Sequence, residues 1–232
     1  ILKKALEYDA SFTQASVLLS KALEKQNKID EAIDVLKKGL ELEPDASPVC
    51  AALGKLYMKQ GLFPDAIEMF KINTCLKSDN ALFHFILGKA YLKNQNYIQA
   101  IDASLESLRL KPKMFQAKIQ LANAYISIRR YQDAKKLLRK MSMYGKNLGV
   151  VHFMLGNIYA LESNYSDALD EYNAGLLYAA DDFLEKEMEL LLTINRQYDD
   201  ETSKVEAFMA AVGLLLTENN YDKTNKTNKT NK

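Results

Sequence analysis

A leucine recurs every 34 residues between residues 19 and 155, and an alanine keeps the same interval thirteen residues further on. The leucines are Leu19, Leu53, Leu87, Leu121 and Leu155, and the alanines are Ala32, Ala66, Ala100, Ala134 and Ala168. A fixed period of this length with helical texture is typical of stacked helix–turn–helix units. Such an array buries its core between neighbouring units and needs no single central core. The period therefore predicts an all-α solenoid.

The period divides the chain into five units, at 13–46, 47–80, 81–114, 115–148 and 149–182. The eighth residue of each unit is small, which lets a neighbouring helix approach closely; these residues are Ser20, Gly54, Gly88, Ala122 and Gly156. A large residue follows a short polar turn and is predicted to begin the second helix: Ile29, Phe63, Tyr97, Tyr131 and Tyr165. Ser104 stands where a large residue is expected, and this departure predicts locally loose packing.

Small residues at position 8, aromatics at position 11, alanine at position 20 and proline near position 32 together resemble the tetratricopeptide repeat (TPR) family. The resemblance covers the five units, and residues 1–12 resemble the second helix of a preceding repeat. It implies a right-handed superhelix whose first helices line a concave groove that holds other proteins. Five units in register are specific for the fold and weakly informative about function, since function depends on sites placed on folds.

Beyond residue 182 the register fails, but two helices are still expected, at about 183–196 and 203–218. Ser203 and Glu206 form the pattern of a capping box at the start of the second of these helices. We interpret 183–219 as a degenerate repeat whose helices cap the array, because terminal units must shield the core from water. An alternative is a homodimer formed through 203–218. The polar, low-complexity tail 220–232 is expected to be disordered.

The composition argues against several functional classes. A formal net charge of +1 gives no global field for nucleic acid, and the longest apolar stretch, 207–216, is too short to span a bilayer. Two cysteines suit a reducing, intracellular and cytoplasmic location. His84 and His152 lie two units apart, so we read each as a replacement for a bulky core residue. We expect no enzyme activity, metal or cofactor, and the start within a repeat suggests a piece of a longer protein.

The groove positions of the family give the candidate binding site. Positions 9 and 13 of the first three units are all lysine: Lys21, Lys25, Lys55, Lys59, Lys89 and Lys93. The apolar and amide positions of the same face are Phe85, Ile119, Asn123, Phe153 and Asn157. This face would suit a peptide or helix with acidic and apolar side chains. The simpler interpretation is that the lysines are only solvated, and nucleic acid is disfavoured because no aromatic residues are interleaved with them.

The most economical function is a non-catalytic scaffold that binds a partner peptide or helix in its concave groove, as part of a larger multiprotein assembly. The alternative is a regulatory or substrate-presenting arm of an enzyme whose catalytic domain lies outside these 232 residues. A longer sequence of the same protein would separate these two functions, by showing either more repeats or a catalytic domain.

Overall fold

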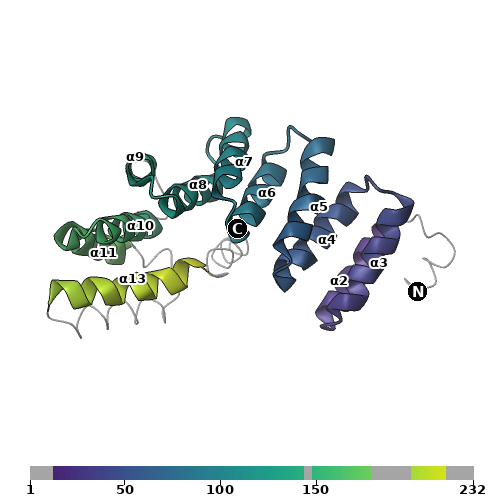
Figure 1. Cartoon of the computed structure of the whole chain (residues 1–232), viewed down its shortest axis with the longest axis horizontal. Helices are drawn as coiled ribbons and strands as arrows, with labels where there is room; N and C mark the ends of the chain where they lie inside the picture. Colours follow the sequence, from purple (N-terminus) through teal and green to yellow (C-terminus); the bar gives the residue numbers. More distant parts are fainter. Residues whose placement is uncertain (1–12, 144–147, 179–199, 218–232) are drawn as a thin grey trace, which may run out of the picture. The chain divides into compact units, whose positions relative to one another are not determined.

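The computed structural model describes residues 13–143, 148–178 and 200–217, apart from the side chains of residues 201 and 212–217 (Figure 1). The secondary structure of these residues is α-helical. The first helices of the repeats are α2 (Thr13–Lys25), α4 (Ser47–Gln60), α6 (Ala81–Lys93), α8 (Phe115–Ser127) and α10 (Leu148–Leu161). The second helices are α3 (Ile29–Leu42), α5 (Phe63–Leu76), α7 (Tyr97–Leu110), α9 (Tyr131–Ser142) and α11 (Tyr165–Tyr178). A further helix, α13, covers Glu201–Thr217.

Each second helix begins at the large residue that the sequence singled out, and the turn before it has a constant geometry. The fifteenth residue of every repeat has a positive φ, and these residues are Asn27, Gly61, Gln95, Arg129 and Ser163. A left-handed residue reverses the chain within a short turn, and glycine adopts it at the lowest steric cost. Four of the five turns therefore hold a residue other than glycine in a conformation that is unfavourable for it.

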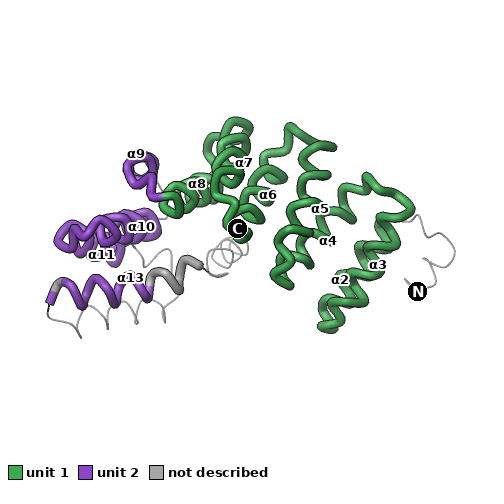
Figure 2. Tube along the Cα trace, viewed as in Figure 1, with its two compact units in different colours: residues 1–128 green, residues 129–232 purple. Residues whose placement is uncertain are grey.

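The chain forms two compact units, residues 1–128 and 129–232 (Figure 2). In the first unit, each second helix packs on its own first helix and on the next one, so that α3 contacts α4, α5 contacts α6 and α7 contacts α8. In the second unit, α10 packs on α9 and α11. The division falls within the predicted repeat 115–148, and the exact repeat boundaries stay a prediction.

The periodic residues form the core. All five alanines have no exposed surface, and the five leucines are buried. At two of the small eighth positions, a large ring from the second helix leaves no room for a side chain: a Cβ on Gly54 would approach the Phe70 ring to 2.6 Å, and one on Gly156 would approach the Tyr172 ring to 2.6 Å. Glycine at these two positions therefore sets how closely the two helices of a repeat approach.

Ser104 does not leave the loose packing that was expected. Its hydroxyl is buried, donates to the Ala100 carbonyl at 2.6 Å and accepts a hydrogen bond from Gln120 Nε2 at 2.9 Å. The amide of Gln120 lies beside Gly88, in the space that a large residue would occupy elsewhere in the array. A polar contact between α7 and α8 thus replaces the missing apolar side chain.

Helix α13 packs against both α10 and α11, in the way that α4 packs against both α2 and α3. Val205 and Phe208 are fully buried, and the Phe208 ring stacks on Tyr172 with 5.1 Å between ring centroids. The predicted capping box is wrong, because the helix begins at Glu201 and Asp200 Oδ1 accepts from the Ser203 N–H at 2.7 Å. Asp200 is thus the capping residue, and this hydrogen bond lowers the pKa of its carboxyl group.

The helix expected at 183–196 and the tail 220–232 lie outside the described residues, as do residues 1–12.

Candidate protein-binding face

The six predicted lysines lie on three successive first helices. Lys21 and Lys25 lie on α2, and the other two pairs occupy the same positions of α4 and α6. All six side chains are exposed. Residues four apart lie on the same side of a helix, so each pair marks one face of its helix. We call the surface that these positions form on α2, α4, α6 and α8 the first-helix face.

An ion pair joins the first-helix faces of the first two repeats. Lys59 Nζ on α4 lies 3.2 Å from Glu24 Oε1 on α2. Among the described residues, no hydrogen bond or ion pair involves the side chains of Lys21, Lys25, Lys55 and Lys93. Most of the positive charge of the face is therefore not neutralised by the fold.

Charge is segregated between the two sets of helices in the first unit. The first helices α2, α4, α6 and α8 carry seven lysines and one acidic residue, Glu24. The second helices α3, α5 and α7 carry eight acidic residues and four basic ones. In this unit the first helices are therefore net basic and the second helices are net acidic.

Apolar side chains accompany the lysines on the same helices. Phe85 and Ile119 are half-buried, and so are Met58, Leu92 and Ile126. Leu82, at the start of α6, is 49% exposed. Asn123 is also half-buried and lies one turn after Ile119 on α8. The first-helix face thus combines a basic part with partly exposed apolar and amide groups.

Two predicted site residues, Phe153 and Asn157, lie on α10 in the second unit. Phe153 has no exposed surface, because Gly175 on α11 leaves room for its ring: a Cβ at Gly175 would approach the ring to 2.6 Å. Its assignment to the groove is therefore wrong. Asn157 is half-buried, and its Oδ1 accepts a hydrogen bond from the Tyr172 hydroxyl at 2.7 Å. The assignment of Asn157 stays a prediction for the second unit, and the first-helix face is defined for residues 13–128 alone.

The comparisons with known proteins agree with this architecture. The sequence model of the tetratricopeptide repeat protein 21 C-terminal ARM domain matches residues 2–120, which are 119 of the 232 residues. The chain belongs to this family. All six lysines of the first-helix face lie within the matched residues. No curated protein matches the sequence.

Solved structures show the same fold. A crystal structure of MamA is 25% identical to this chain and covers 69% of this chain and 94% of MamA, with a TM-score of 0.63. YrrB, described as a TPR protein with an unusual peptide-binding site, is 18% identical to this chain. The match covers 78% of this chain and 93% of YrrB, with a TM-score of 0.64. A TPR protein from Parabacteroides merdae is 15% identical to this chain. The match covers 97% of this chain and 88% of that protein, with a TM-score of 0.69. The predicted all-α TPR fold is confirmed, and it supports a general protein-binding role.

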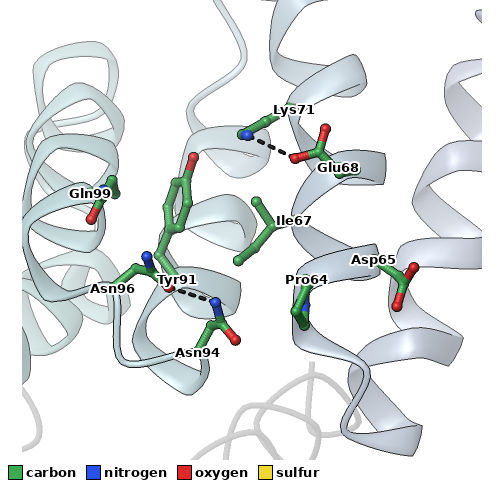
Figure 3. Close-up of a pocket in the computed structure, with 9 residues that line it drawn as sticks. All are labelled: Pro64, Asp65, Ile67, Glu68, Lys71, Tyr91, Asn94, Asn96 and Gln99. Carbon is green, nitrogen blue, oxygen red and sulfur yellow. Dashed lines mark hydrogen bonds and ion pairs between the residues drawn. The ribbon is translucent and has the colours of Figure 1, made fainter.

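The first unit also has a pocket of about 370 Å³ that the sequence did not indicate (Figure 3). It lies between α5, the end of α6 and the start of α7. Tyr91 and Ile67 supply its apolar wall, and the Lys71–Glu68 ion pair, with 2.8 Å between Nζ and Oε1, crosses one side. This ion pair raises the pKa of Lys71. Asn94 Nδ2 donates to Asn96 Oδ1 at 2.6 Å at the opposite side.

The described residues contain no cluster of potential metal ligands. The two histidines are half-buried: His84 Nε2 donates to the Ser78 carbonyl at 2.8 Å, and His152 Nδ1 lies 2.7 Å from Glu171 Oε2. Cys50 is buried, and burial raises the pKa of its thiol. None of the described helices is long and apolar enough to cross a membrane.

Proposed function

We propose that the chain is a non-catalytic scaffold that binds a partner protein on the first-helix face, as part of a multiprotein assembly. The partner presents a peptide or helix with acidic and apolar side chains. The charge segregation between first and second helices supports this proposal, because a face with more basic than acidic side chains attracts acidic partners.

The two components of the face would contribute differently to binding. An exposed ion pair adds only about 0.2–1 kcal/mol, so the lysines chiefly increase the association rate and reject basic sequences. The affinity would come from burying Phe85, Ile119 and their apolar neighbours, at about 25 cal/mol per Å² of apolar surface. The peptide-binding site named for YrrB, a protein of the same fold, is compatible with this use of a TPR array.

Capture of a partner from cell lysate tests the proposal. The test variant combines Lys21→Glu, Lys55→Glu and Lys89→Glu. The control variant combines Lys37→Glu, Lys38→Glu and Lys113→Glu, which produces the same change in charge at exposed positions outside the first helices. Circular dichroism establishes that both variants are folded. We expect a specific partner to be lost by the test variant and retained by the control. Retention by both variants would contradict the proposal.

A further inference from the structure

We infer that the pocket between α5, α6 and α7 is a second binding site, which takes an arginine side chain of a partner protein. This site goes beyond the proposed function, because it lies away from the first-helix face. A helix has about 3.6 residues per turn, so two residues along it rotate the side chain by about 200°. Tyr91, which supplies the aromatic wall of the pocket, therefore lies on the side of α6 opposite to Lys89 and Lys93.

The charges that line the pocket favour a cation. They are two carboxylates, on Asp65 and Glu68, and one ammonium group, on Lys71. Lys71 Nζ lies 2.8 Å from Glu68 Oε1, so these two charges offset each other. Among the described residues, no hydrogen bond or ion pair involves the Asp65 carboxylate. One negative charge is thus left without a counter-charge, and the net acidic second helices around it attract cations.

The uncharged lining groups supply further acceptors. Asn94 Nδ2 donates to Asn96 Oδ1 at 2.6 Å, and the Asn94 Oδ1 accepts no hydrogen bond from another described residue. Gln99, in the first turn of α7, adds an amide oxygen that is likewise not used by the described part of the chain. A guanidinium group carries five N–H donors and no acceptor. It can therefore bind several of these oxygens at once.

Tyr91 favours arginine over lysine. Its side chain is half-buried, and in Figure 3 its ring lies between Ile67 and Gln99. A guanidinium group is planar and stacks on an aromatic ring, whereas an ammonium group is a compact and strongly hydrated charge. The aliphatic stem of arginine also packs on apolar surface, which Ile67 and Pro64 supply.

A side chain of a peptide suits the pocket better than a free small molecule. The volume of about 370 Å³ is at the small end of the range for ligand pockets, about 300–1,000 Å³. Such pockets cover about 70–90% of the surface of a small ligand. Here Asp65, Glu68, Lys71 and Gln99 are exposed, so the rim is open to solvent. An arginine that extends from a peptide needs cover only for its own side chain, while the peptide backbone stays outside.

Four capped peptides test the inference by NMR spectroscopy of the full chain. Each is acetyl-Gly-Ser-X-Ser-Gly-amide, where X is arginine, lysine, glutamate or citrulline, which has the shape of arginine without its charge. The side-chain amide signals of Asn94, Asn96 and Gln99 report on the pocket. We expect the arginine peptide to shift these signals and to bind at least about threefold more tightly than each of the others. Equal or tighter binding of another peptide, or no shift with the arginine peptide, would overturn the inference.

Two variants change the charge of the site in opposite directions. Glu68→Gln leaves Lys71 without its counter-charge and should weaken binding of the arginine peptide about two- to fivefold. Lys71→Gln frees the Glu68 carboxylate and should strengthen binding by a similar factor. A site for anions would give the reverse signs.

Glu106→Gln is the matched control. Glu106 Oε1 lies 2.7 Å from Arg109 Nη2 on α7, which is an ion pair of the same spacing outside the pocket lining. This variant should leave binding unchanged. An effect equal to that of Glu68→Gln would show that the peptide binds the acidic surface in general, and would also overturn the inference. The outcome is separate from that of the proposed function, which depends on lysines on the opposite side of α6.

Discussion

Lys59 Nζ on α4 lies 3.2 Å from Glu24 Oε1 on α2, and this contact joins the first helices of two successive repeats. Glu24 is the one acidic residue on the described first helices of residues 13–128. The Glu24 side chain is 21% exposed and that of Lys59 is 56% exposed. The pair is therefore a weak structural contact, and its main effect is to neutralise one lysine of a basic surface.

Removing this counter-charge should strengthen partner binding. Glu24→Gln keeps the shape of the side chain and leaves Lys59 unpaired, so an acidic helical peptide should bind a few-fold more tightly, in line with about 0.2–1 kcal/mol for one exposed pair. Fluorescence anisotropy measures the affinity. Glu68→Gln is the matched control, because Glu68 pairs with Lys71 on the second helix α5. Weaker binding by Glu24→Gln would indicate that the glutamate itself contacts the partner.

The turns make a reciprocal prediction about stability. Gln95→Gly should stabilise the protein by about 1 kcal/mol, because glycine avoids the steric cost of φ 60°. Gly61→Gln should destabilise it by a similar amount, because Gly61 has φ 76° and nothing near its Cβ position to compensate. Urea denaturation of both variants measures the change in the free energy of unfolding. A loss of stability in Gln95→Gly would show that the glutamine side chain supports the turn.

The buried contact between α7 and α8 can be broken from one side. Ser104→Ala removes the acceptor of the Gln120 amide and leaves a buried N–H group unpaired, which costs about 1–3 kcal/mol. Thermal denaturation should show this loss. Ser127→Ala is a suitable control, because the Ser127 hydroxyl is exposed and donates to the Asn123 carbonyl of its own helix. Equal effects of the two substitutions would mean that Gln120 finds another partner.

Tyr172 should make stability sensitive to alkaline pH. Burial raises the pKa of its phenol above the ordinary value, so the folded protein retains a proton that the unfolded chain releases. The contribution is fully present below about pH 10 and is lost as the pH rises above that value. Denaturation between about pH 9 and 11 should therefore show a steeper fall for the wild type than for Tyr172→Phe. Parallel curves would mean that the phenol ionises equally in both states.

Much of the fold could be predicted from the sequence, because the same packing contacts recur in every repeat. The leucines, the crossing alanines and the small eighth residues meet in every repeat, so their spacing appears directly in the sequence. Contacts that do not recur from repeat to repeat could not be predicted from the sequence. The Phe153 ring is buried in the space that Gly175 leaves, and the Gln120 amide fills the space beside Ser104. Each contact joins two different positions of the repeat, so the period does not reveal it. Asp200 caps α13 beyond the five regular repeats, so the repeat pattern could not identify it.

The candidate site was predictable as a set of positions on the first helices. The sequence alone did not weigh the charge of the first helices against that of the second helices, because this comparison requires the helix boundaries. The Lys59–Glu24 ion pair could not be predicted from the sequence either, since it joins residues 35 apart in different repeats. The partly exposed apolar groups also needed the structure, because Phe85 and Phe153 occupy the same repeat position and only Phe85 keeps exposed surface.

Site-specific photocrosslinking tests the central claim most directly. Benzoylphenylalanine would replace Leu82 on α6 in one variant and Leu105 on α7 in the other; the two leucines are 49% and 45% exposed, respectively. After incubation with cell lysate and irradiation, we predict that the partner is crosslinked at position 82 and not at position 105. Crosslinking at position 105 alone would place the partner on the second helices and contradict the assignment of the first-helix face.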